Sequence, residues 1–503
     1  MTPDDTLSRT LAAPGATWFG WFLWLLALAL LPLTSLSWIP FDTPVRPPTP
    51  VLAGMAMALL LGAGFMDWRN FLAMRQVRAL GLFVAWALFA TAVGLLLDAH
   101  PPMKGYTGLS AAAKGVISLG MGVCVYLTAQ VALMDRERRR QSEHWLIAGM
   151  SLCVLLALIQ ALAGLGVAWA SQLSLWVADH LTVQYGAKPY LAEGRAWGLS
   201  LEPSFMASAL AVILLPIGMT RALVDGSRMG WYAATLGYVG IGLSTSRGGL
   251  LAALVVTGLA LTWLAVPAAQ HLGKRRRLIS SLTLLILLAI GLGLGGRSRV
   301  TSCVVHLPPL LSEAALVSAP PPGRSSAAAP PATAGCLGLA AQQTMRPDWV
   351  DHFGEISMLY RALCGIVAWE TFLDHPIAGT GLGLSGWELR QRFPAWARED
   401  IGIAEIAADL DESNPRLPNA KNLPLRLLAE LGSIGFALFA LFIWLHRPGQ
   451  IAGRPEAVLL PLLVFGALAV DWLTIDSFAL VAPWLALAWA ANARERYGDV
   501  EAR

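Results

Sequence analysis

Runs of apolar residues long enough to cross a lipid bilayer recur along most of the chain. A helix that spans a bilayer needs roughly 17–25 such residues, and the first run extends from Trp18 to Ile39. Charged residues make up only 14% of the 503 residues, whereas soluble proteins carry about a quarter. A transmembrane barrel would instead show short segments of alternating polarity. The pattern predicts an all-α, polytopic membrane protein.

The apolar runs predict twelve membrane-spanning helices. They lie at about residues 18–39, 51–66, 79–97, 113–134, 145–169, 201–219, 229–246, 249–267, 278–295, 425–445, 457–473 and 476–491. This divides the chain into three parts: helices one to nine in residues 1–295, a large loop in residues 296–424, and helices ten to twelve with a C-terminal tail in residues 425–503.

Basic residues are distributed unequally between the two sides of these helices. The even-numbered loops hold fifteen lysines and arginines, and the short odd-numbered loops hold five. Because loops rich in lysine and arginine stay in the cytoplasm, we expect both termini to be cytoplasmic and the large loop to face the periplasm from the bacterial inner membrane. The net charge of +4 is small and spread over short loops, which argues against nucleic acid as a partner.

The large loop between helices nine and ten has two different parts. Residues 308–343 are rich in proline, alanine, serine and glycine, which predicts a flexible insert. From Glu355 apolar residues recur at helical spacing until His375-Pro376, which ends the helix. A turn with three glycines in residues 379–383 follows, and then a second amphipathic stretch from Trp387 to Trp396. We expect these helices to lie on the membrane surface.

Three stretches place ionisable residues at the outer ends of predicted spans, where such residues are usually functional. Arg195 and Glu202 lie at the outer end of span six, Arg247 lies in the tight turn between spans seven and eight, and Lys421 and Asn422 precede span ten. Arginine offers planar, bidentate donors to phosphate oxygens, and helix N-termini add amide donors. The set suits a diphosphate at headgroup depth, and a diphosphate is also a leaving group whose developing charge these cations would stabilise.

Structural interpretations of the same residues stay open. Arg195 can be an ordinary loop arginine, and Arg247 can extend to the lipid headgroups. Glu202 suits the start of a helix, and Lys421 can be an interfacial lysine. The sequence alone does not decide between these roles and substrate binding.

The remaining candidates are two histidines and two cysteines of the large loop. His352 is a loop histidine that we keep as a further catalytic candidate, whereas His375 ends a helix. Cys303 and Cys336 flank the flexible insert and can pair if the loop lies in an oxidising compartment. Neither a zinc-ligand spacing nor a Walker-type glycine loop occurs, so we expect no metal and no cofactor.

Four motifs resemble, in their order along the chain, those of the O-antigen ligase and polymerase superfamily. Lys421-Asn422, nine residues and Gly432-Ser-Ile-Gly435 match the spacing of the family's His-Asn and Gly-x-x-Gly, with lysine in place of histidine. Trp369 to Gly383, the turn Ser246-Arg247-Gly248, and Arg195 to Ala207 resemble the other three motifs. The resemblance covers most of residues 110–490 and leaves out about 300–345.

The resemblance implies a metal-independent membrane glycosyltransferase. An undecaprenyl-diphosphate-linked glycan would bind through its diphosphate to Arg195 and Arg247, with Lys421 and Asn422 beside them. An acceptor hydroxyl would then attack the anomeric carbon with inversion, and undecaprenyl diphosphate would leave. Lys421 would occupy the place of the family's general base, although lysine is normally protonated at neutral pH.

Three interpretations of Lys421 follow from the resemblance. Lys421 is a third diphosphate ligand while Glu202 or His352 acts as the base, or Lys421 is a base whose pKa is lowered by desolvation. The third interpretation is that stabilisation of the leaving group makes a strong base unnecessary.

We expect a polymerase of the O-antigen or exopolysaccharide type, which joins lipid-linked repeat units at the periplasmic face. The alternative is a ligase that transfers the finished glycan to lipid A core or to a protein. A flippase and a chain-length regulator as partners would favour the polymerase. A transporter of lipid-linked sugars is the hypothesis from another class, and it predicts charged residues along a path through both leaflets.

Overall fold

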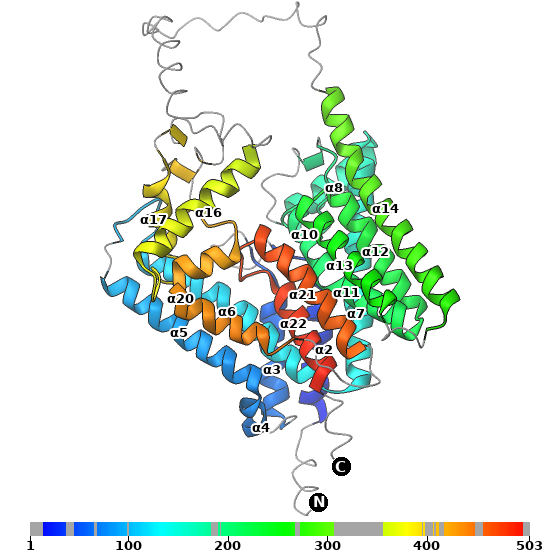
Figure 1. The fold of residues 1–503 in the computed structure, drawn as a ribbon, viewed down its shortest axis with the longest axis horizontal. Helices are drawn as coiled ribbons and strands as arrows, with labels where there is room; N and C mark the ends of the chain where they lie inside the picture. Colours follow the sequence, from blue (N-terminus) through cyan, green and yellow to red (C-terminus); the bar gives the residue numbers. More distant parts are fainter. Residues whose placement is uncertain are drawn as a thin grey trace, which may run out of the picture.

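The computed structural model describes residues 14–36, 45–64, 68–97, 100–182, 190–191, 193–266, 272–305, 356–394, 396–397, 406, 409–411, 417–447 and 456–495. These residues are mostly helical, without a β-strand among them (Figure 1). The elements used below are α2 (Pro14–Ala29), α3 (Thr49–Gly62), α4 (Trp68–Ala73), α5 (Arg75–Leu97), α6 (Gly108–Ala132), α7 (Arg136–Gly164), α8 (Ala168–His180), α10 (Pro203–Ala209), η2 (Leu210–Leu214), α11 (Leu215–Thr220), η3 (Arg221–Asp225), α12 (Arg228–Ser244), α13 (Arg247–Ala265), α14 (Lys274–Val305), α16 (Ile356–Asp374), α17 (Ser385–Arg392), α20 (Leu423–Trp444), α21 (Glu456–Thr474) and α22 (Val481–Glu495).

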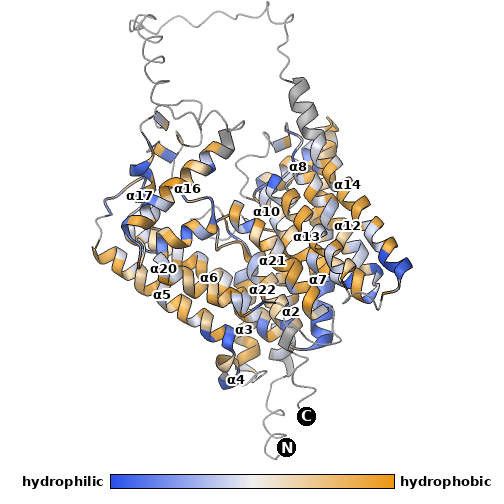
Figure 2. Cartoon of the chain, viewed as in Figure 1, coloured by the Kyte–Doolittle hydropathy of each residue, from blue (hydrophilic) through white to orange (hydrophobic). Residues whose placement is uncertain are grey.

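Each predicted span contains a helix, but the helices differ in length. Eight of the described helices are long and apolar enough to cross a membrane: α5, α6, α7, the continuous segment Pro203–Asp225, α13, α14, α20 and α21. The helices α2, α3 and α22 are apolar but shorter, and α12 has 17 residues. Figure 2 shows mainly hydrophobic residues along α5, α7 and α14. The chain is therefore a multi-pass membrane protein, and the count of twelve spans stays a prediction.

The first span is shorter than the sequence predicted. Its helix ends at Ala29 rather than at residue 39, because Pro32 follows and cannot continue the backbone hydrogen bonding of a helix. The residues after it bind the loop that precedes α10 instead. Ser200 Oγ donates to Pro32 O at 2.9 Å, and Leu201 N donates to Thr34 Oγ1 at 2.7 Å.

The segment Pro203–Asp225 lies at the centre of the bundle. Buried residues make up 89% of its apolar window, against 28% in α14. It contains two π-helical turns, η2 and η3. Pro216 follows η2 and has no N–H for the usual hydrogen bond to residue 212, so a local change to π-type hydrogen bonding precedes it.

The helix α20 is broken at Gly432, where φ is 66° and ψ is −170°. The glycine-rich turn after α16 fills this break. Three backbone hydrogen bonds join them: Thr380 N to Ala429 O at 2.9 Å, Gly381 N to Glu430 O at 2.7 Å, and Ser433 N to Pro376 O at 2.8 Å. The turn thus replaces hydrogen bonds that the broken helix loses, which matters because unsatisfied backbone groups are costly inside a membrane.

The same turn packs closely against α5. A Cβ at Gly94 would lie 2.0 Å from Thr380 O, so only glycine permits this approach. Trp86 Nε1 donates to Leu431 O at 3.0 Å, which satisfies another carbonyl near the break. These contacts fix α20 relative to α5 and to the turn.

We predict that Gly432→Ala destabilises the protein by roughly 2–4 kcal/mol, because a side chain at this φ is strained and overpacks the core. Its Cβ would lie 2.2 Å from Ile377 O. Thermal unfolding of the purified protein in detergent, followed by tryptophan fluorescence, measures the effect. Gly258→Ala in α13 is the control, since a Cβ there meets nothing within 4 Å. Equal melting temperatures of the two variants would contradict the proposed role of the break.

Candidate active site

Residues 475–480, the loop between α21 and α22, hold the N-terminus of α20. Lys421 N donates to Asp476 Oδ2 at 3.0 Å, and Asn422 Nδ2 contacts Leu473 O at 3.5 Å. Asn422 is also the N-cap of α20, because its side chain accepts from Leu425 N at 3.0 Å. The predicted Lys421-Asn422 pair therefore lies against the end of α21.

Two arginines from other helices meet the same end of α21. Arg247 is the exposed first residue of α13, and a Cβ on the next residue, Gly248, would lie 2.9 Å from Thr474 Oγ1. Arg361 on α16 donates from a guanidinium nitrogen to Thr474 O at 2.5 Å. The first turn of α13 and the side chain of Arg361 thus both contact Thr474. Arg361 was missed because it belongs to no motif, although it is the one arginine in the first, largely apolar part of α16 and was a usable signal.

Arg195 lies beside the turn that carries Arg247. Ala196 N donates to Leu243 O at 3.1 Å, which joins the Arg195 loop to the end of α12. The guanidinium carbon of Arg195 lies 5.3 Å from the centre of the Tyr190 ring, and one nitrogen lies 3.3 Å from Glu193. Its Nε is buried and has no hydrogen-bond partner among the described residues.

Gln160, near the C-terminal end of the membrane helix α7, holds this loop in place. Its Oε1 accepts from Trp197 N at 2.8 Å and from Gly198 N at 2.7 Å. Its Nε2 donates to Gly198 O at 3.0 Å. Gln160 is only 2% exposed, so these buried backbone groups depend on one side chain.

Glu202 is the N-cap residue of α10, next to the Arg195 loop. Its carboxylate accepts from Ser204 Oγ at 3.0 Å. Burial raises the pKa of Tyr190, the charge of Glu202 raises it further, and Arg195 lowers it. Glu202 and Arg195 therefore both lie close enough to Tyr190 to interact with it electrostatically.

Packing connects this group to the loop between α21 and α22. Leu201 and Phe205 pack with Val45, Met121 and Ala479. In Figure 1, α8 and α10 lie at the same upper end of the bundle as α16 and α17. The structure therefore brings the predicted residues Arg195, Glu202, Arg247, Lys421 and Asn422 to one end of the bundle.

Lys421 has a strained backbone, with φ at 55°, and an ammonium group surrounded by charge. Its Nζ lies 5.7 Å from the centre of the Tyr360 ring, whose hydroxyl donates to Asp409. Burial raises the pKa of Cys364 to about 12, while Lys421 lowers it and Asp409 and Asp476 raise it. An aromatic face and two carboxylates thus lie near Lys421, and they stabilise a positive charge there.

A cavity of about 240 Å³ lies beside the first turns of α20. Lys114, Ser385, Asn419 and Arg426 are among the residues that line it. The guanidinium of Arg426 is held by Glu430 at 3.1 Å and by Asp476 O at 2.6 Å. Ser385 Oγ donates to Glu430 at 3.0 Å. The Glu430 carboxylate therefore has two partners, Ser385 and Arg426, and it orients the guanidinium of Arg426.

Three predictions fall partly or wholly outside the part of the chain that the structure describes. His352 and Cys336 are outside it, and at Cys303 only the helical backbone is described. His375 ends α16 as expected, and its carbonyl accepts from Gly379 N at 3.0 Å. Among the described side chains, no three metal-ligating groups come together as a metal site.

Residues 231–440 match the family model described as O-antigen ligase. This stretch of the chain is similar to the O-antigen ligase domain. The resemblance to the O-antigen ligase and polymerase superfamily, inferred from four motifs, is therefore confirmed. Members of this family are membrane glycosyltransferase-like ligases and polymerases, which act on lipid-linked glycans and acceptors in the membrane. No curated protein matches the chain.

The O-antigen ligase domain contains only part of the site. Arg247, Arg361 and Lys421 lie within residues 231–440, whereas Arg195 and Glu202 precede them. The helices before residue 231 therefore supply the rest of the site: α7 holds the Arg195 loop, and Glu202 is the N-cap of α10.

We predict that Gln160→Leu raises the KM for the lipid-linked donor roughly tenfold or more, because Arg195 loses its fixed position. The loss of acceptors for two buried N–H groups also destabilises the protein by about 2 kcal/mol. Turnover at varied donor concentration and a melting curve measure the two effects. Gln141→Leu is the control, since Gln141 lies on the same helix but near its other end, where it bonds Trp21. An unchanged KM in Gln160→Leu would show that the loop does not need this support.

Proposed function

We propose that this protein polymerises undecaprenyl-diphosphate-linked repeat units at the periplasmic face of the bacterial inner membrane. The observation that carries the proposal is the arrangement around the end of α21. Arg361 and the first turn of α13, which begins with Arg247, both contact Thr474. Lys421 is bonded to Asp476 in the loop that follows. Cations and helix N-termini gathered at one end of a membrane bundle suit a diphosphate at headgroup depth.

In the proposed reaction the diphosphate of the donor binds to Arg195, Arg247 and Arg361, with Lys421 and Asn422 beside it. The hydroxyl oxygen of the acceptor glycan forms a bond to the anomeric carbon from the side opposite the diphosphate. The bond between that carbon and the diphosphate oxygen breaks, and undecaprenyl diphosphate leaves with the electron pair. The arginines and Lys421 stabilise the negative charge that develops on the leaving group.

The environment of Lys421 supports a role as a cation rather than as a base. The Tyr360 ring lies 5.7 Å from the Lys421 Nζ, Asp476 accepts from the Lys421 backbone N–H, and Asp409 accepts from the Tyr360 hydroxyl, so this side chain has partners suited to a cation. Glu202 is then the candidate that takes the proton from the acceptor hydroxyl, with His352 as the alternative. A reaction driven mainly by departure of the diphosphate would need little help from either.

A ligase that transfers the glycan to lipid A core or to a protein is the second candidate. It is favoured by the description of the matching family, O-antigen ligase. A transporter is disfavoured, because Arg195, Arg247 and Arg361 gather at one end of the bundle instead of following a path through it.

We predict that purified protein in detergent, given synthetic undecaprenyl-diphosphate-linked repeat units alone, releases undecaprenyl diphosphate and forms longer glycans. Arg195→Ala, Arg247→Ala and Arg361→Ala should each lower this rate about tenfold to a hundredfold, since each removes a charge-assisted hydrogen bond to the diphosphate. Arg228→Ala, at the first residue of α12 and thus at the helix end opposite Arg247, should leave the rate unchanged. Release only after addition of core lipid or protein would establish the ligase, and no release under either condition would refute both proposals.

We predict that Lys421→Arg keeps a substantial fraction of the wild-type rate, whereas Lys421→Ala loses about tenfold or more. Arginine preserves the positive charge but cannot act as a base at neutral pH. The initial rate of undecaprenyl diphosphate release, measured for both variants at equal donor concentration, separates the two roles. Equal loss in both variants would point to a lysine base, and full turnover of Lys421→Ala would exclude both roles.

A further inference from the structure

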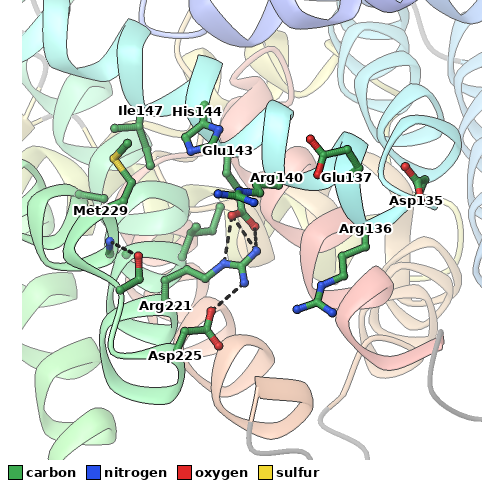
Figure 3. Close-up of a pocket in the computed structure, with 15 residues that line it drawn as sticks. Asp135, Arg136, Glu137, Arg140, Glu143, His144, Ile147, Arg221, Asp225 and Met229 are labelled. Atoms are coloured by element: carbon green, nitrogen blue, oxygen red, sulfur yellow. Dashed lines mark hydrogen bonds and ion pairs between the residues drawn. The ribbon is translucent and has the colours of Figure 1, made fainter.

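A second cavity lies at the other end of α7, far from the candidate active site. Its volume is about 780 Å³, and it is lined by the first turns of α7, the end of the segment Pro203–Asp225 and the start of α12 (Figure 3). A Cβ at Gly164, the last residue of α7, would lie 3.4 Å from Gly194, next to Arg195. Since α7 has 29 residues, its two ends are about 43 Å apart. The cavity therefore lies at the opposite face of the membrane.

The carboxylates that line this cavity already have partners. Arg221 donates to both oxygens of Glu143 at 2.8–3.0 Å and to Asp225 at 2.7 Å, and Figure 3 shows it between these two acids. Asp135 caps α7 by accepting from Arg138 N at 3.2 Å. Glu137 accepts from the side chain of Gln141 at 3.3 Å.

Three basic side chains that line the same cavity are available to bind a ligand. Arg136, Arg140 and His144 lie at every fourth position of α7, so they share one face of the helix. All three are exposed, and no hydrogen bond or ion pair joins their side chains to a described residue. The cavity thus presents two guanidinium groups and an imidazole whose side chains have no partner in the described part of the chain.

The deeper wall and the surface beside the cavity are apolar. Ile147 and Ile217 line the cavity as buried residues. Along the neighbouring contact of α7 with α12, Met229 is 41%, Tyr232 48% and Leu155 54% exposed. A soluble phosphate would use only the basic mouth, whereas a phospholipid would also cover this exposed apolar surface.

We propose that this cavity binds the headgroup of an anionic phospholipid in the leaflet opposite the active site. The phosphate lies between Arg136 and Arg140, and the acyl chains lie along the exposed contact of α7 with α12. Basic pockets between membrane helices recognise anionic headgroups in this way. The bound lipid connects α7 to the central segment Pro203–Asp225 and stabilises the bundle.

The test is native mass spectrometry of the full-length protein, purified in neutral detergent and titrated with phosphatidylglycerol, phosphatidylcholine or inorganic phosphate. We expect phosphatidylglycerol to bind and to raise the melting temperature. The double variant Arg136→Ala/Arg140→Ala should bind it roughly thirtyfold more weakly. Both arginines are exposed, so the variant is expected to fold.

The matched control is Arg69→Ala/Arg75→Ala, which removes one exposed arginine from α4 and one from α5. It should bind phosphatidylglycerol like the wild type. Equal binding by both double variants, equal binding of phosphatidylcholine, or full displacement of the lipid by inorganic phosphate would each overturn the proposal. The release of undecaprenyl diphosphate reports on the candidate active site at the other face of the membrane. The lipid-binding result and the activity result are therefore independent.

Discussion

The arrangement of the site depends on the break of α20 at Gly432 and on the glycine-rich turn that fills it. An unbroken α20 would have made all of its own backbone hydrogen bonds. It would also have occupied the space in which the turn after α16 now lies. The break frees groups that Thr380, Gly381 and Pro376 then bond. Because such bonds are strong in a membrane, they fix α16 beside α20, and with them Arg361 and Lys421.

The short loop between α21 and α22 fixes the positions of the charged groups, as the glycine-rich turn fixes the helices. Its carboxylate Asp476 holds the backbone of Lys421, and its carbonyl holds Arg426. Thr474 just before it contacts Arg361 and the start of α13. The positive charges at the site are thus balanced and oriented by a few carbonyls and carboxylates. In the proposed reaction, cations held in this way would need little reorganisation as the diphosphate leaves.

Much of the site could be predicted because its residues lie at helix ends that the sequence marks. Arg195, Arg247 and Lys421 precede predicted spans, and the structure places them at one end of the bundle. Arg361 could not be found in this way, since its role arises from a contact with Thr474 that is 113 residues away in the chain. The end of the first span was predicted wrongly, because an apolar run continues past Pro32 while the helix does not.

The sequence by itself determined that the chain is helical, lies in a membrane and carries its distinctive charged residues at helix ends. These properties follow from local hydropathy and from the strong preferences of proline and glycine. Only the tertiary structure decided which of those ends meet, why Gly432 and the turn at residues 379–383 need each other, and how one glutamine in α7 holds the Arg195 loop. Such contacts join residues far apart in the chain, and the physical reason is that buried backbone groups must find partners wherever the fold supplies them.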